Sequence, residues 1–167
     1  MPPYQPRNAF RRATFLYSRF LDVLVVLTVA ILIIPVSLQI FARFTELLPR
    51  YIWTEEAARF LLVWMVMIGA MIGVREGSHF VVDLFPSLTG RKKAALDLIS
   101  GLFMLIFGFI FLWYGIEFTE FALYRISELA EWPLWLIHMA WPIAGFSWLL
   151  FTGEHMWDSL QVLRGRG

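Results

Sequence analysis

Apolar and charged residues alternate in blocks along this chain. Four stretches consist mainly of apolar residues and contain no Asp, Glu, Lys or Arg: 23–42, 60–74, 98–116 and 132–153. A helix that crosses a bilayer core of about 30 Å needs roughly 20 residues, and apolar stretches of about 18 or more are typical of spanning helices. With their flanking residues included, these stretches predict four transmembrane helices, at about residues 21–42, 55–75, 96–117 and 133–154.

The composition agrees with a membrane protein. Hydrophobic residues make up 59% of the chain, charged residues 16%, and the mean hydropathy is +0.67. We predict a single all-α integral membrane domain over 1–167, and we expect no separate soluble module within these residues. The chain has no cysteine, which excludes disulfides, thiolate metal sites and cysteine nucleophiles.

Basic residues are distributed unevenly between the segments that connect the predicted spans. Ten of the fourteen Lys and Arg residues fall on the side of the N-terminus: Arg7, Arg11, Arg12, Arg19, Arg75, Arg91, Lys92, Lys93, Arg164 and Arg166. Because Lys and Arg concentrate in cytoplasmic loops, we predict that both termini are cytoplasmic. Residues 1–20 combine arginines with aromatic residues, so we expect a short interfacial helical segment there, on the anionic leaflet.

The start of the second span carries a cluster of charged residues. Thr54 fits a helix N-cap, and Glu55 and Glu56 then fall in the first turn, where the helix dipole favours carboxylates. Arg59 follows at helical spacing and can pair with either carboxylate. The cluster is either ordinary chemistry at a helix end or a charged contact to a partner subunit.

Glycines recur at helical spacing in two spans. They are four residues apart at the second span and seven apart in the third: Gly69, Gly73 and Gly77, then Gly101, Gly108 and Gly115. Helices in lipid gain no hydrophobic free energy from touching each other, so close approach at small residues contributes more to their packing. We predict that these glycines pack helices together, within this chain or against a larger membrane subunit.

Acidic residues recur beyond the outer end of the third span. Glu117, Glu120, Glu128 and Glu131 would form one stripe if the helix continued through them. We therefore expect this span to extend past the membrane or to bend along its surface. The stripe is either a solvated face or a docking strip for a soluble partner outside the membrane.

The loop after the second span contains Arg75, His79 and Asp83. His79 and Asp83 are four residues apart and could share a hydrogen bond on a helix. Two ligands do not complete a metal site, so we predict no metal here.

The middles of the four predicted spans lack the ionisable residues that line the substrate or proton path of a transporter. We also find no catalytic triad, phosphate-binding glycine loop or cluster of metal ligands, so we predict neither an enzyme nor a transporter that works alone. Two classes are left: an auxiliary membrane subunit, and a haem-carrying anchor subunit of an electron-transfer complex. Haem typically needs two axial histidines at one depth. Only His79 and His155 share a side of the membrane, both at its edge, so we predict no cofactor.

The segment 53–83 resembles the small membrane subunit of tripartite ATP-independent periplasmic (TRAP) transporters, the DctQ-like family. The matching residues are Trp53, Glu55, Glu56, Ala57, Arg59, Trp64, Gly69, Arg75, Gly77, His79, Val82 and Asp83. The predicted layout of four spans with both ends inside is also similar to that family.

This resemblance implies a complex in the bacterial inner membrane. A periplasmic binding protein (P) would capture an organic acid and deliver it to a large many-span subunit (M), which would move it inward with sodium. The small subunit would be non-catalytic: it would scaffold the large subunit, contact membrane lipids and help to dock the binding protein. No nucleic acid, cofactor or metal is implied.

Overall fold

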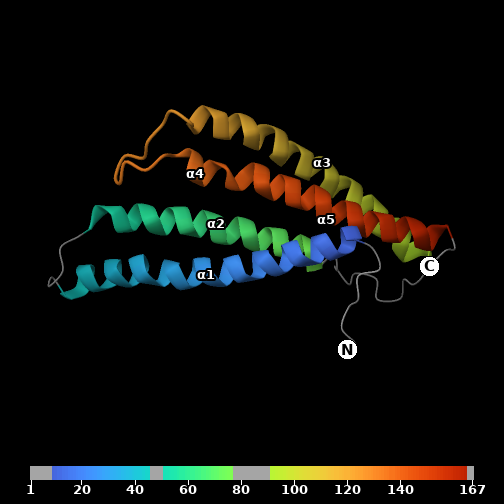
Figure 1. Cartoon of the computed structure of the whole chain (residues 1–167), viewed down its shortest axis with the longest axis horizontal. Coiled ribbons are helices and arrows are strands. Elements are labelled where there is room, and N and C mark those ends of the chain that lie inside the picture. Colours follow the sequence, from blue (N-terminus) through green and yellow to red (C-terminus); the bar gives the residue numbers. More distant parts are fainter. Residues whose placement is uncertain (1–8, 46–50, 77–90, 165–167) are drawn as a thin grey trace.

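The computed structural model describes residues 9–45, 51–76 and 91–164, and this part of the chain is helical apart from one loop over 123–134. The helices are α1 (Ala9–Thr45), α2 (Ile52–Glu76), α3 (Arg91–Ala122), α4 (Trp135–His138) and α5 (Ala140–Leu163). Figure 1 shows them as an elongated bundle in which α1 lies beside α2, and α3 lies beside α4 and α5.

Four helical segments are long and apolar enough to cross a membrane: Ala9–Thr45, Ile52–Glu76, Lys93–Ala122 and Trp135–Leu163. The prediction of an all-α protein with four spanning helices is confirmed to this extent. The first helix is longer than predicted, because residues 9–20 of the basic lead continue α1 instead of forming a helix of their own. At about 1.5 Å per residue, α1 is roughly 55 Å long, which exceeds the thickness of a bilayer core.

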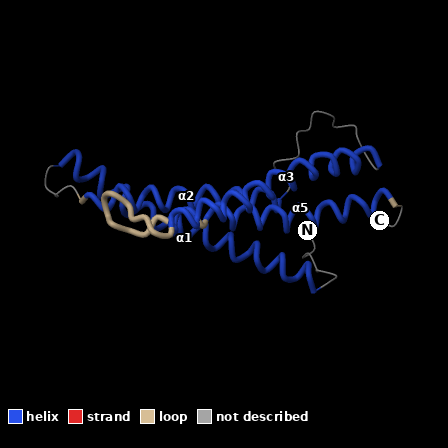
Figure 2. The backbone as a smooth tube through the Cα atoms, turned by 90° about the horizontal axis from the view of Figure 1, so that it is seen from above, coloured by secondary structure: helices blue, strands red, loops and turns tan. Residues whose placement is uncertain are grey.

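The two helix pairs meet through α2 and α5, and in the view of Figure 1 they converge toward the end of the bundle where α1 begins and α5 ends. Seen from above in Figure 2, α1 and α3 spread apart at that end. The buried cluster at this junction takes residues from three helices: Leu21, Ile68, Met71, Val74, Ala144, Trp148 and Phe151. Met71 and Phe151 are fully buried at its centre. The core is therefore a narrow column, and most apolar residues lie on the outside of the bundle.

Helix α1 contacts the bundle along a single narrow seam. Its buried residues recur strictly every seven positions: Thr14, Leu21, Thr28, Pro35 and Ala42. A seven-residue repeat keeps one line of side chains facing a neighbouring helix, as in a coiled coil. Among the described residues, most of α1 away from this seam is exposed or half-buried.

The fourth span is interrupted between α4 and α5. Pro142 lies in the first turn of α5, where its missing N–H costs little, but its ring would clash with the carbonyl four residues earlier in a continuous helix. That carbonyl belongs to His138, the last residue of α4. The proline thus explains why the helix restarts at this point.

Candidate functional site

The glycines of α3 lie against α5. A Cβ atom at Gly115 would come within 2.7 Å of the backbone nitrogen of Pro142, and one at Gly108 would come within 3.2 Å of the Leu149 side chain. At Gly101 it would meet the Met156 side chain at 2.6 Å. The seven-residue spacing therefore coincides with a close helix contact inside this chain, and α5 contributes a fourth glycine, Gly145, to the same contact.

The glycines of α2 have different surroundings. Gly69 is exposed, and a Cβ added there would meet no atom within 4 Å. Gly73 is half-buried. Gly77 lies outside the described residues, as do His79 and Asp83. At Gly69 the close approach that glycine permits is therefore not used by any of the helices that the structure describes.

The charged cluster at the start of α2 divides into an exposed pair and a buried carboxylate. Arg59 Nη2 lies 4.0 Å from Glu55 Oε1, and both side chains are exposed, so this ion pair contributes little to stability. Glu56 is buried, and its Oε2 accepts a hydrogen bond of 2.5 Å from the backbone N–H of Ala130. The N-cap prediction for Thr54 is wrong: α2 begins at Ile52, and the Thr54 hydroxyl donates to the Tyr51 carbonyl.

Glu56 is one of three contacts that tie α2 to the segment between α3 and α5. Phe60 packs edge-on against Trp132, with ring centroids 5.7 Å apart. One helical turn further, the indole N–H of Trp64 donates to the carbonyl of Leu136 at 3.0 Å. The residues Glu56, Phe60 and Trp64 recur every four positions and therefore lie on one face of α2.

The loop 123–134, which we call the outer hairpin, has internal order of its own. Ile126 and Pro133 form an antiparallel bridge, and the backbone N–H of Ser127 donates to the Trp132 carbonyl. The Trp132 N–H in turn donates to the Ser127 hydroxyl, and Glu131 adopts a positive φ of 56° at the tip. The sequence signal for this turn is the Trp132-Pro133 pair, since proline excludes a continuing helix at the preceding residue.

The prediction of one continuous helical acidic stripe is wrong. Helix α3 ends at Ala122, so only Glu117 and Glu120 lie on it, whereas Glu128 and Glu131 belong to the outer hairpin. All four carboxylates are exposed. They lie toward one end of the bundle on two different elements, because the chain reverses direction between them.

A buried ion pair joins α2 to α5 near the other end of the bundle. Arg75 Nη1 lies 2.5 Å from Glu154 Oε2, and the two side chains are only 14% and 6% exposed. The Arg75 guanidinium also lies 5.4 Å from the centre of the Phe151 ring, and His155 Nε2 donates to the Arg75 carbonyl at 3.0 Å. Arg75 was among the residues that the sequence pointed to, but Glu154 was not. The only sign of Glu154 in the sequence is that it is the first charged residue after the uncharged stretch 132–153.

Helix α1 reaches α5 through two further polar contacts. Arg11 forms an ion pair with Asp158, and the Tyr17 hydroxyl lies 2.7 Å from the Ser147 hydroxyl. These contacts hold the first turns of α1 against α5, Asp158 in its second half and Ser147 in its first. Three charged or polar cross-links thus gather where the helix pairs converge.

The described histidines are too far apart to ligate one haem. His138 ends α4 and its Nδ1 donates to the Leu134 carbonyl, whereas His155 lies seventeen positions later near the opposite end of α5. That separation corresponds to about 25 Å along the helix axis.

Comparison with known proteins identifies the family. The family model described as "Tripartite ATP-independent periplasmic transporters, DctQ component" matches residues 32–162. The "C4-dicarboxylate TRAP transporter small permease protein DctQ" of Rhodobacter capsulatus is 31% identical over 96 residues, which are 55% of this chain and 42% of that relative. The matched segment thus spans less than half of the relative's length. The family match runs from the middle of α1 to the end of α5 and includes both the buried ion pair and the outer hairpin, and the chain therefore belongs to the DctQ component family of tripartite ATP-independent periplasmic transporters.

Proposed function

We propose that this chain is the non-catalytic small permease subunit of a sodium-coupled TRAP transporter that imports an organic acid. It scaffolds a large many-span membrane subunit in the bacterial inner membrane, with both of its own termini in the cytoplasm. The family match over residues 32–162 carries this proposal. The haem-carrying alternative has no comparable support.

The scaffolding role is supported by the large apolar surface that the chain leaves uncovered. In the most apolar window of α1 only 6% of the residues are buried, and in that of α3 only 11%. Such faces must meet lipid or another membrane protein, and the exposed Gly69 offers a place where a second backbone can approach α2 closely. We assign part of this surface to the large subunit.

A second role, docking of the periplasmic binding protein, is supported by the outer end of the bundle. Glu117, Glu120, Glu128 and Glu131 are exposed there, next to a hairpin that Glu56 anchors. A firmly held, negatively charged surface favours a partner with a basic patch. Reversing the charges of Glu120 and Glu128 should then weaken uptake at limiting binding protein.

The organic acid is a carboxylate, by analogy with the C4-dicarboxylate named for the Rhodobacter capsulatus relative. The uncharged middles of the spans indicate that this chain does not itself hold the substrate or the sodium ion. Both are assigned to the large subunit.

The test is affinity purification of the tagged chain from its native membrane in mild detergent, followed by mass spectrometry. We expect a many-span membrane protein at a ratio near one to one. Recovery of the chain alone would overturn the proposal.

Two glycine variants then locate the contact with the large subunit. Gly69→Leu should reduce co-purification, because the new side chain projects from α2 where a partner would approach. Gly153→Leu is the matched control: Gly153 is also an exposed helical glycine with no atom within 4 Å of an added Cβ, but it lies on α5. Equal recovery with both variants would remove Gly69 from the interface.

A further inference from the structure

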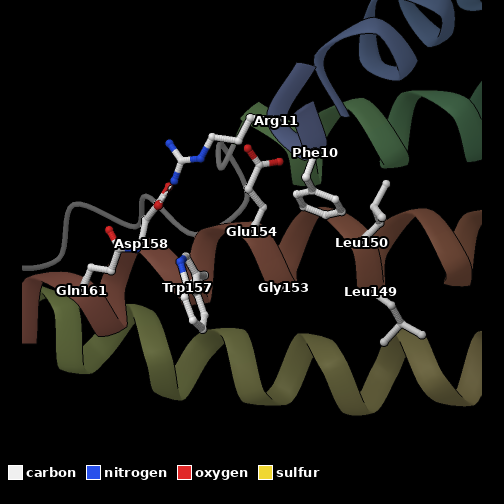
Figure 3. A pocket seen from close by; sticks show the side chains of 9 residues that line it. All are labelled: Phe10, Arg11, Leu149, Leu150, Gly153, Glu154, Trp157, Asp158 and Gln161. Carbon is white, nitrogen blue, oxygen red and sulfur yellow. Dashed lines mark hydrogen bonds and ion pairs between the residues drawn. The ribbon is translucent and has the colours of Figure 1, made fainter. Parts of the chain in front are cut away.

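A groove lies between the first turn of α1 and the middle and second half of α5, near the end of the bundle where α1 begins (Figure 3). It is an open groove with a volume of about 760 Å³, which is within the roughly 300–1,000 Å³ of small-molecule sites. We call it the terminal groove. It is distinct from the outer hairpin, and it shares Leu149 with the glycine contact between α3 and α5.

One end of the terminal groove is apolar. Leu149 and Leu150 line it from α5, and Phe10, which is 54% exposed, lines it from α1. Between them the floor is open at Gly153, where no side chain fills the space and an added Cβ would meet no atom within 4 Å. An apolar groove on the lipid-facing surface of a membrane-spanning helix is suited to bind the acyl chain of a lipid.

The other end of the groove is charged. Arg11 and Asp158 are joined there as an ion pair that links α1 to α5, and Glu154 lines the groove from α5 (Figure 3). From Leu149 to Gln161 the lining extends twelve residues along α5, which is about 18 Å. Trp157, 57% exposed, flanks the charged half, as tryptophans do at the depth of lipid headgroups.

Because the terminal groove is apolar at one end and charged at the other, we propose that it binds a phospholipid whose headgroup carries a primary ammonium, such as phosphatidylethanolamine. The acyl chain follows the apolar end over Gly153. The phosphate meets the guanidinium of Arg11, and the ammonium meets the carboxylate of Asp158. The existing ion pair does not prevent this, because a guanidinium has five N–H donors and a carboxylate accepts several hydrogen bonds.

The balance of charge favours this headgroup over an anionic one. The groove is lined by two carboxylates and one guanidinium, but Glu154 is paired with Arg75 and Asp158 with Arg11, so these charges are balanced. A lipid with phosphate as its only charged group would add a negative charge that no cation of the groove is left to compensate. A headgroup with both charges complements both members of the ion pair.

This inference depends on insertion of the chain in a bilayer and not on the transport role proposed above. Loss of lipid binding would leave co-purification with a large subunit untouched. Failure of that co-purification would leave the lipid site untouched in turn.

The test is native mass spectrometry of the full-length chain, purified in detergent, stripped of lipid and titrated with three phospholipids of identical acyl chains. We expect phosphatidylethanolamine to bind about tenfold or more tightly than phosphatidylglycerol, because one charge-assisted hydrogen bond contributes about 1.5 kcal/mol or more. Phosphatidylcholine, whose ammonium has no N–H, should bind more weakly than phosphatidylethanolamine. Equal binding of all three lipids would overturn the headgroup assignment.

Two variants test the position of the site. Gly153→Leu fills the apolar end and should abolish the tightest lipid adduct, whereas Gly69→Leu, an equally open glycine on α2, should retain it. Asp158→Asn keeps the shape of the groove and should remove the preference for phosphatidylethanolamine over phosphatidylcholine. If Gly153→Leu and Gly69→Leu bind lipid alike, the adducts are general surface lipid and the proposal is wrong.

Discussion

The contact between α3 and α5 leads to a quantitative prediction at Gly145. A methyl group added there would lie 2.5 Å from the backbone nitrogen of Leu112 and 2.8 Å from the carbonyl oxygen of Gly108. Both atoms belong to the backbone of the opposing helix and cannot rotate away. The two helices must therefore separate by roughly 1 Å at this point, and a gap of that size removes a quarter to a half of the dispersion energy of the affected contacts.

We expect Gly145→Ala to destabilise the chain by about 1–2 kcal/mol. Overpacking typically costs about 1–3 kcal/mol, and the better helix propensity of alanine offsets up to about 1 kcal/mol of this. For a chain of this size, 1 kcal/mol corresponds to a shift of about 2–4 °C in Tm, so the Tm should fall by about 2–8 °C.

The assay is thermal unfolding in detergent, followed by tryptophan fluorescence. Gly153→Ala is the matched control, because it adds the same methyl to the same helix where no atom lies within 4 Å. Gly108→Ala should fall between the two, since its methyl meets the Leu149 side chain at 3.2 Å, and that side chain can move. Identical Tm values for Gly145→Ala and Gly153→Ala would refute the close backbone contact.

Three further predictions concern the ion pair, the outer hairpin and the orientation. Arg75→Leu leaves the buried Glu154 carboxylate without its cation and should cost about 3–5 kcal/mol, whereas the double variant with Glu154→Leu should recover most of that loss in thermal unfolding. No recovery in the double variant would show that desolvation of the carboxylate is not the cause. Glu56→Ala removes the acceptor of the Ala130 N–H and should accelerate hydrogen exchange of that amide at least tenfold, while Glu55→Ala, an exposed neighbour, should not. Because the chain has no cysteine, Tyr124→Cys gives an orientation probe in the outer hairpin, where Tyr124 is 96% exposed. A membrane-impermeant maleimide should label it from the periplasmic side of intact cells. Labelling only after lysis would reverse the predicted topology.

The spanning helices could be predicted from the sequence because they depend on a property of each segment alone. An apolar stretch long enough to cross the bilayer must satisfy its backbone hydrogen bonds internally, and a helix does so without a partner. The break between α4 and α5 is likewise a local effect, of Pro142 on the carbonyl of His138. The family resemblance could also be recognised from the sequence, because the matching residues lie within one continuous segment, 53–83.

Which residues meet across the bundle was decided by the tertiary structure. Glu154 lies 79 positions after Arg75, and Ala130 lies 74 positions after Glu56, so no helical spacing links the members of either pair. The acidic stripe failed as a helix for the same reason: periodicity described Glu117 to Glu131 as one face, but contacts with α2 hold part of that segment in a hairpin.

Glycine spacing shows the same division between sequence and structure. The glycines at Gly101, Gly108 and Gly115 have α5 opposite them, whereas Gly69, which belongs to an equally regular pattern, faces open space. Spacing determines which residues share a face of a helix, because it follows from 3.6 residues per turn. What covers that face depends on where the other helices lie, and that is set by the packing of the whole bundle.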